Sequence, residues 1–302
     1  MNHPPSRIKA ILLAFLITII WSTSWVLIKI GLREIPALTF AGLRYTLAFV
    51  CLLPFLFSKD NLQQVKKLQA TDWMRLGLYG FIGYALAQGT QFLGLSYLPS
   101  VTVSLLLNLT SIFVAFSGMV VLKERPTWLQ WLGVGFNLAG VLIYFFPGAF
   151  QGSQWLGFFF VAISLAGNIG AALIGRSVNR SGRYSPLVVT VISMGFGSLL
   201  MLVSGIISQG LPTISLTGWG IILVLAVVNT AFAFTVWNFT MQTLTAMESS
   251  LINSTMLIMV AILSWIFLGE SLDPKEILGL ILAATGVLIV QLRVNRSKEI
   301  KA

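Results

Sequence analysis

Long apolar stretches alternate with short polar segments along almost the whole chain. A helix needs about 20 apolar residues to cross the hydrocarbon core of a bilayer, and the apolar stretches have this length. The pattern therefore predicts an all-α polytopic membrane protein with ten spanning helices. The predicted spans are residues 10–31, 37–57, 74–94, 99–122, 127–147, 155–176, 185–207, 217–238, 245–268 and 275–293.

Composition indicates that the bilayer is the solvent of this chain. Of its 302 residues, 57% are hydrophobic and only 9% are charged, whereas a soluble domain carries about 25% charged residues. The net charge of +10 is spread over short loops and tails, so we expect no nucleic-acid partner. With one cysteine, Cys51, and one histidine, His3, we expect no catalytic residues, no metal site and no cofactor.

The lysines and arginines predict the orientation of the chain. If the N-terminus is cytoplasmic, 15 of these residues lie inside and only Arg33 and Lys275 lie outside. This asymmetry follows the positive-inside rule and places both termini in the cytoplasm, which requires an even number of spans.

The second half of the chain repeats the first. At a shift of 146 residues, 97–143 align with 243–289 without a gap, pairing Glu124 with Glu270, Gly133 with Gly279 and Gly140 with Gly286. Five helices per half is an odd number, so the second half enters the membrane from the opposite side and the repeats are inverted. We expect a first five-helix repeat at 1–147, a second at 155–293 and a cytoplasmic tail at 294–302.

Two further patterns predict local packing. The paired glycines at 133, 140, 279 and 286 are expected to allow close contact between helix backbones. The longest loop, 58–72, has Leu62, Val65 and Leu68 at helical spacing, which predicts a short helix on the cytoplasmic membrane surface.

Polar side chains recur at helical spacing inside the predicted spans, where they are costly unless they face a cavity or a neighbouring helix. They are expected to line one central cavity that binds a substrate. The alternative is hydrogen bonding between helices, worth about 0.6 kcal/mol per contact, and packing for the tryptophans. The candidate substrate-binding residues are Trp21, Ser22, Trp25, Tyr84, Gln88, Gln91, Asn108, Ser111, Asn168, Asn229, Trp237 and Asn253.

Among the basic residues in the predicted spans, only Lys29 and Arg44 lie more than one residue away from a span end. Lys29 is near the external end of the first, where its ammonium either reaches the membrane interface or serves as a gate or substrate contact. Arg44 is about two turns into the second. It is expected to face lipid or to pair with Glu34, with direct substrate binding as the third option.

The predicted spans hold no carboxylate at mid-membrane depth. Proton-coupled carriers usually have an ionisable group there, so facilitated movement or exchange is favoured, and Glu248 is the best remaining candidate for coupling. The spans also lack a central pair of basic residues, which phosphate binding usually needs. Neutral or zwitterionic molecules of amino-acid size are therefore the expected cargo.

Several motifs are similar to those of a known family. They are Trp21-Ser-Thr-Ser-Trp-Val, Ala41-Gly-Leu-Arg-Tyr, Leu122-Lys-Glu-Arg-Pro and Leu268-Gly-Glu-Ser, the last two followed by the paired glycines. In these the chain resembles the EamA family of the drug/metabolite transporter superfamily, over almost its whole length. The resemblance implies ten helices in two inverted repeats, a cavity formed by helices 1, 3, 4, 6, 8 and 9, and export of amino acids or related metabolites. It also implies a multi-pass protein of the inner (plasma) membrane.

The chain departs from this family at two positions. Members often have a proline midway along the fourth and ninth helices, where this chain has Ser111 and Leu257. A proline would free a backbone carbonyl. Its absence shifts the expected binding role to side chains such as Asn108 and Asn253.

The sequence therefore favours a secondary transporter that exports small metabolites by alternating access. The alternatives are an exporter or flippase of amphipathic drug-like or lipid-linked molecules, a channel, and an intramembrane enzyme. The expected partners are a small-molecule substrate and the lipid bilayer, with the protein a monomer or a homodimer.

Overall fold

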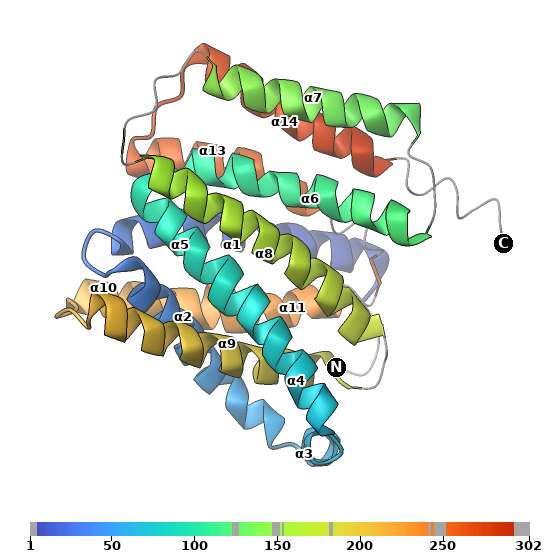
Figure 1. Ribbon diagram of the computed structural model, residues 1–302, viewed down its shortest axis with the longest axis vertical. Coiled ribbons are helices and arrows are strands. Elements are labelled where there is room, and N and C mark those ends of the chain that lie inside the picture. The colour runs from blue at the N-terminus through green and yellow to red at the C-terminus, as the bar shows by residue number, and fades with distance from the viewer. Residues whose placement is uncertain are drawn as a thin grey trace. The chain divides into compact units, whose positions relative to one another are not determined.

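The computed structural model describes residues 5–122, 127–146, 152, 154–180, 184–240, 243–244 and 252–292. All regular elements within these ranges are helices (Figure 1). They are α1 Arg7–Gly31, α2 Ala37–Leu56, α3 Lys59–Lys66, α4 Ala70–Gly80, η1 Phe81–Leu86, α5 Ala87–Tyr97, α6 Ser100–Leu122, α7 Trp128–Phe145, α8 Gln154–Arg180, α9 Pro186–Gln209, α10 Leu216–Ala226, η2 Val227–Phe232, α11 Ala233–Thr240, α13 Met256–Leu268 and α14 Pro274–Leu292.

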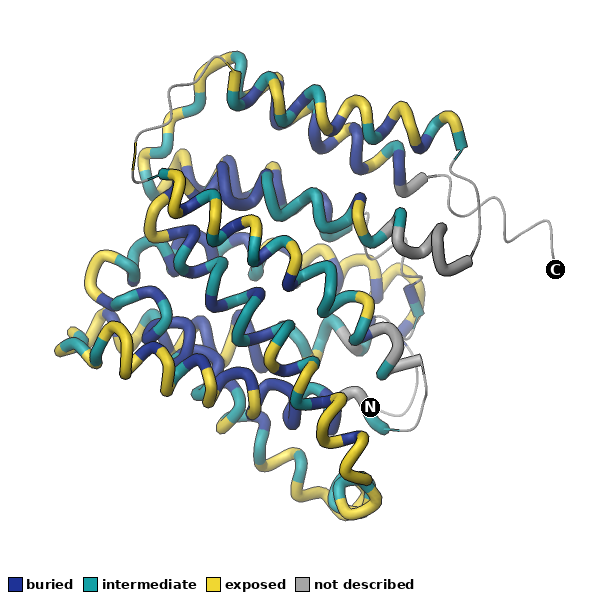
Figure 2. Tube along the Cα trace, in the orientation of Figure 1, coloured by how far each residue is buried: buried dark blue, intermediate teal, exposed yellow. Residues whose placement is uncertain are grey.

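The helices have the length and composition of membrane spans. Six are long and apolar enough to cross a bilayer: Arg7–Gly31, Ala37–Leu56, Trp128–Phe145, Gln154–Gly175, Leu187–Gln209 and Leu216–Trp237. Ser100–Val114 and Ile252–Leu268 are shorter apolar helices. Many large apolar side chains are exposed, Leu142 and Ile207 among them, and exposed positions recur along most helices (Figure 2). Such a surface suits lipid, and the structure is that of a helical polytopic membrane protein.

The short helix expected in the longest loop is present as α3. The side chains of Val65 and Leu68 pack against a buried cluster that includes Leu76 and Val188. The apolar face of α3 is therefore used, at least in part, to contact α4 and α9 of the protein itself.

The helices form two compact units that differ from the two sequence repeats. The described parts of unit 1 come from residues 1–26, 99–152 and 236–302, and those of unit 2 from residues 27–98 and 153–235. Unit 1 thus contains most of α1 together with α6, α7, α13 and α14. Unit 2 contains α2–α5 with η1, and α8–α10 with η2. Each unit includes helices from both halves of the chain.

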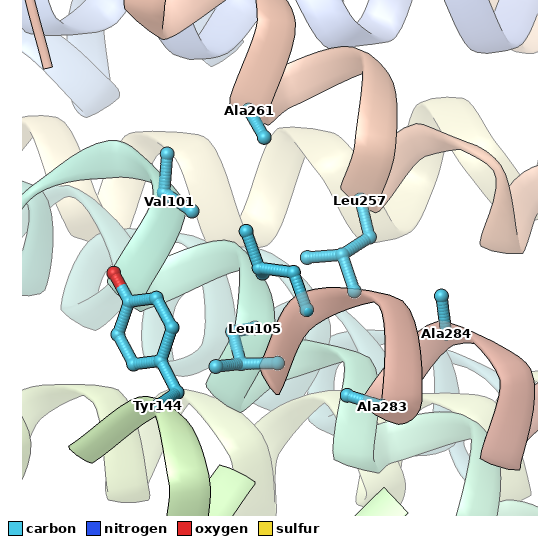
Figure 3. Close-up of a cluster of buried hydrophobic side chains, with 8 residues drawn as sticks. Val101, Leu105, Tyr144, Leu257, Ala261, Ala283 and Ala284 are labelled. Carbon is cyan, nitrogen blue, oxygen red and sulfur yellow. The ribbon is translucent and has the colours of Figure 1, made fainter. Parts of the chain in front are cut away.

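Unit 1 has an apolar core to which four helices contribute (Figure 3). Its buried members are Val101 and Leu105 of α6, Tyr144 of α7, Leu257 and Ala261 of α13, and Leu280, Ala283 and Ala284 of α14. Leu257, the position at which the resembled family often has proline, is therefore a core residue. Tyr144 keeps its hydroxyl satisfied through a 3.0 Å hydrogen bond with Thr102.

The paired glycines lie where α7 and α14 cross in unit 1 (Figure 1). A Cβ added to Gly133 would lie 2.7 Å from the Gly286 carbonyl oxygen, and one added to Gly279 would lie 2.7 Å from the Gly140 carbonyl oxygen. These pairings show that the two helices run antiparallel with their backbones in contact. The predicted role of the glycines is confirmed.

Asn137 lies at the same crossing. Its Nδ2 atom donates to the Ala283 carbonyl oxygen at 2.9 Å, and the two residues are 146 positions apart in the sequence. Equivalent positions of the two repeats therefore meet at the centre of the α7–α14 contact.

The glutamate of the Leu268-Gly-Glu-Ser motif caps another helix. Gly269 ends α13 in the left-handed region, with φ of 68°. The next residue, Glu270, accepts hydrogen bonds from the backbone N–H groups of Ser100 at 2.9 Å and Val101 at 3.3 Å. A carboxylate in this place satisfies two free N–H groups at the start of α6 and complements the helix dipole.

We expect Glu270→Gln to lower stability by about 1 kcal/mol, because the charge of the cap is lost while one acceptor oxygen is kept. Thermal unfolding of the purified protein in detergent would show a melting temperature lower by about 2–4 °C. The matched control is Asp60→Asn, a carboxylate-to-amide change at the exposed start of α3. Equal effects of the two substitutions would contradict the capping role.

Candidate functional site

A cluster of polar side chains is buried among the apolar helices of unit 2. Two consecutive residues of α2, Arg44 and Tyr45, contact side chains from two other spans. The other members are Tyr84 of η1, Gln88 of α5 and Thr230 of η2. We call these five residues the Arg44 cluster.

Arg44 is the most unusual member, because it is a charged side chain that is only 5% exposed. Its Nε atom donates to Thr230 Oγ1 at 3.1 Å. The guanidinium carbon lies 5.0 Å from the ring centre of Tyr45 and 5.9 Å from that of Phe92. Aromatic faces at these distances attract a cation, but they do not supply a counter-charge.

Both leading expectations for Arg44 were wrong. The side chain is buried and does not face lipid. Glu34 is not its partner, because its Oε1 accepts from the Ser215 backbone N–H and its Oε2 from the Ser215 hydroxyl at 2.8 Å. The sequence fixes the depth of a residue in a span but not the direction in which it points, since α2 is apolar on every side.

Tyr45 and Gln88 connect Arg44 to the third predicted span. The Tyr45 hydroxyl donates to Gln88 Oε1 at 2.9 Å. The Tyr45 ring also meets the Tyr84 ring edge to face, with centroids 5.7 Å apart. Together with the hydrogen bond between Arg44 and Thr230, these contacts join α2 to the third and eighth predicted spans.

The third and eighth predicted spans each contain a π-helical segment, η1 and η2. The segments cover residues 81–86 and 227–232, which are 146 positions apart. Thr230 fits the wider geometry of η2, because its hydroxyl donates to the carbonyl oxygen of Leu225, five residues earlier, at 2.8 Å. Short π-helical segments occur frequently at functional sites, and here both contribute to the Arg44 cluster.

The remaining candidates in unit 2 have mixed environments. Asn229 precedes Thr230 in η2 and is only 1% exposed. Asn168 is tied to its own helix, since Nδ2 donates to the Ser164 carbonyl oxygen at 2.8 Å. Gln91 lies one turn beyond Gln88 on α5, is half-buried, and has no hydrogen bond to any other described residue.

Unit 1 brings two of the predicted tryptophans together. The rings of Trp21 and Trp237 have centroids 5.0 Å apart and are tilted by 49°. Trp25 is buried at 6% exposure. Ser22 is fully buried, and its hydroxyl donates to the Thr18 carbonyl oxygen of its own helix at 2.8 Å, so its donor is already used.

Asn108 and Asn253, also in unit 1, each carry a buried amide atom without a hydrogen-bond partner among the described residues: Nδ2 of Asn108 and Oδ1 of Asn253. Buried polar atoms are rarely left unpaired. Asn253 precedes a turn at Thr255 that interrupts the helix, whereas α6 continues through Ser111 without a break. Side chains of α6 and the ninth predicted span therefore keep free hydrogen-bonding capacity.

Lys29 does not serve as a free interfacial anchor. Its Nζ atom donates to the carbonyl oxygens of Leu95 at 2.6 Å and Leu98 at 2.7 Å, both in unit 2. A lysine at this place satisfies free carbonyls at the C-terminus of α5 and complements the negative end of its dipole. The structure thus gives Lys29 a structural partner for its charge.

The sequence pointed to part of the Arg44 cluster. Tyr84 and Gln88 are among the predicted substrate-binding residues, and Asn229, also predicted, precedes Thr230 in η2. Tyr45 and Thr230 are not among them, and substrate binding is only the third option for Arg44. The available signal was the motif Ala41-Gly-Leu-Arg-Tyr itself, which places a charge inside an apolar span. The twelve predicted residues are divided between the units: Tyr84, Gln88, Gln91, Asn168 and Asn229 in unit 2 and the other seven in unit 1.

Apolar helices with polar side chains enclosed between them are typical of an integral membrane protein that has a polar site within the bilayer. The model of the EamA-like transporter family matches residues 8–146 and 155–292 of the chain. The chain belongs to this family. It is accordingly a multi-pass protein of the plasma membrane, and it is related throughout to transporters.

Named relatives cover nearly the whole chain. An S-adenosylmethionine/S-adenosylhomocysteine transporter of Chlamydia trachomatis is 24% identical over 97% of this chain and 90% of its own. A probable amino-acid metabolite efflux pump of Salmonella typhimurium is 24% identical over 92% of this chain and 93% of its own. An uncharacterized transporter of Archaeoglobus fulgidus is 25% identical over 93% and 96% of the two chains.

A solved crystal structure has the same fold. It matches 96% of this chain and 100% of its own with a TM-score of 0.69, at 17% sequence identity. This similarity concerns the arrangement of helices alone.

Proposed function

We propose that the protein is a secondary transporter that exports small metabolites, in particular amino acids or related neutral or zwitterionic solutes. It works by alternating access through a central cavity. It uses ten spanning helices with both termini in the cytoplasm, as two inverted repeats at 1–147 and 155–293 with a tail at 294–302. It has no enzymatic activity.

The observation that carries this proposal is the Arg44 cluster. Its five hydrogen-bonding or charged side chains lie among helices whose outer surfaces are apolar, and all but the half-buried Gln88 are buried. Polar groups in such a place are costly and usually mark a substrate pathway. The relatives, one named as an S-adenosylmethionine/S-adenosylhomocysteine transporter and one as a probable amino-acid metabolite efflux pump, support small solutes as cargo.

The proposed inversion of the repeats is supported by two pairings. α7 and α14 cross antiparallel at equivalent glycines, with Asn137 bonded to Ala283, 146 positions away. η1 and η2 occupy equivalent positions in the third and eighth spans. Both features recur at the spacing of the sequence repeat.

Exchange or facilitated movement is the proposed mode, because the carboxylates that form hydrogen bonds within the described ranges serve helix ends. Glu34 binds Ser215, Asp72 accepts from the Gln69 N–H and the Tyr184 hydroxyl, and Glu270 caps α6. Each is thereby committed to structure. Glu248, the coupling candidate from the sequence, lies outside the described residues.

Counterflow in proteoliposomes tests the proposal. Vesicles are loaded with a mixture of unlabelled amino acids, and uptake of each labelled amino acid is followed at equal pH on both sides. We expect transient accumulation of at least one amino acid, reduced by roughly tenfold or more in Gln88→Ala, because a half-buried hydrogen-bonding group is lost and Tyr45 loses its acceptor.

Ser96→Ala is the matched control, since Ser96 is exposed on the same helix and bonds only within it. It should leave the flux unchanged. No accumulation of any amino acid by folded protein would contradict the amino-acid proposal and favour amphipathic or lipid-linked molecules.

A further inference from the structure

We propose that Arg44 binds a carboxylate group of the transported molecule, so that the substrates are small carboxylate-bearing solutes. This rests on the proposed transport function and adds the chemical class and the residue that recognises it. The juxtaposition that points to it is a buried guanidinium that is hydrogen-bonded to the π-helical segment η2 and lies against the rings of Tyr45 and Phe92, with no counter-ion in the part of the chain that the structure describes.

Charge is the first argument. A cation removed from water is strongly unfavourable unless an anion compensates it. Arg44 is 5% exposed, and its only hydrogen bond to a described residue goes to the neutral hydroxyl of Thr230. The positive charge of Arg44 would therefore attract an anion that enters the cluster.

The donor geometry is the second argument. Arginine has five N–H donors in a planar fork that matches the two oxygens of a carboxylate. Nε of Arg44 is held by Thr230, which fixes one side of the guanidinium. The two Nη groups have no partner among the described residues, and they form the side of the fork that a carboxylate would occupy.

Lys29 shows the contrast. It is the other basic residue that lies more than one residue inside a predicted span, and two backbone carbonyls accept hydrogen bonds from its ammonium at 2.6 and 2.7 Å. Its charge is thus assigned to holding the end of α5. Arg44 has no such partner, which separates a binding role from a capping role.

The same comparison limits the class of anion. Phosphate recognition usually uses more than one basic group. The described groups in contact with Arg44, namely the Thr230 hydroxyl and the rings of Tyr45 and Phe92, include no second basic side chain. One arginine beside the hydroxyls of Thr230 and Tyr45 suits a singly charged carboxylate.

Ligand-induced thermal shifts of the full-length protein in detergent test the proposal independently of transport. The probes are the amino acids and, for each, the matched carboxamide, which keeps the side chain and ammonium but removes the negative charge. We expect at least one acid, but not its amide, to raise the melting temperature. Arg44→Gln should abolish this acid-specific shift and weaken the apparent affinity for the acid by roughly tenfold or more, as expected for a lost charge-assisted contact.

The melting temperature without ligand separates a binding role from a purely structural one. Without a ligand, Arg44→Gln should melt at the same or a higher temperature than the unsubstituted protein, because an uncompensated buried charge is removed. A structural role predicts a lower melting temperature. Thr230→Val provides the second variant: it keeps the guanidinium, so the preference for acid over amide should persist with weaker binding.

The outcomes separate this inference from the proposed function. Equal shifts from acid and amide, an acid-specific shift that persists in Arg44→Gln, or no shift from any acid would overturn the carboxylate site. If one of these thermal-shift results were obtained and counterflow were still observed, the proposed transport function would stand. An acid-specific shift that depends on Arg44, without counterflow of any solute, would overturn transport and leave the carboxylate site standing.

Discussion

Gly140→Ala is expected to destabilise the protein severely, by about 3 kcal/mol or more. A Cβ at position 140 would lie 2.5 Å from the carbonyl oxygen of Gly279, which belongs to the backbone of α14 and cannot rotate away. α7 and α14 would have to separate, with loss of the dispersion contacts along their crossing and of the Asn137–Ala283 hydrogen bond. The measurement is thermal unfolding in detergent, together with the yield of monodisperse protein on gel filtration.

Gly135 provides a matched control on the same helix. A Cβ at this position would meet nothing within 4 Å, and Gly135 is exposed. Because alanine is favoured over glycine inside a helix by about 1 kcal/mol, Gly135→Ala should be neutral or slightly stabilising. Similar melting temperatures for the two variants would refute the close backbone contact between α7 and α14.

Lys29→Met is expected to lower stability by about 2–3 kcal/mol. Methionine keeps an unbranched apolar side chain but removes two charge-assisted hydrogen bonds to the Leu95 and Leu98 carbonyl oxygens. These carbonyls close the C-terminus of α5, so the end of this helix should also become more accessible to hydrogen exchange. Thermal unfolding and hydrogen exchange at residues 94–98 measure the two effects.

Lys59→Met is the comparison for the charge change alone, because Lys59 is exposed at the start of α3. It should alter the melting temperature little. If Lys29→Met were equally mild and left exchange at the end of α5 unchanged, Lys29 would be an interfacial anchor, as its position near the end of a span first suggested.

Helix positions could be predicted closely from hydropathy, because burying a helix in lipid requires a nearly continuous apolar run. The run at 155–176, for example, corresponds to α8, Gln154–Arg180. The same uniform apolarity hides the face that points inward. For this reason Arg44 was assigned to lipid or to Glu34, although it lies inside unit 2.

The site was predictable only in part. Tyr84 and Gln88 could be selected because polar residues at helical spacing in a span are rare. Thr230 lies in the π-helical segment η2. The wider turn of this segment could not be predicted from the hydropathy pattern. The shift of 146 residues does pair η1 with η2, but the sequences of the two segments, with Gly83 and Tyr84 opposite Asn229 and Thr230, differ too much for the repeat to reveal them.

The contacts between helix ends could not be predicted from the sequence either. Glu34 and Glu270 bind backbone N–H groups 181 and 170 residues away. Such pairings depend on which helix ends the fold brings together. Only the position of each glutamate at a predicted loop was available from the sequence.

Solute protection of a single cysteine tests the central claim, that the transported solute occupies the Arg44 cluster, most directly. Cys51, the only native cysteine, is replaced by serine, and Gln91→Cys is introduced one turn from Gln88; a second protein carries Ser96→Cys on the exposed side of α5. Maleimide labelling is then timed in proteoliposomes with and without the solute found by counterflow. The account predicts slower labelling at position 91 in the presence of solute and no change at position 96. Identical labelling rates at position 91 with and without a solute that the variant still transports would contradict it.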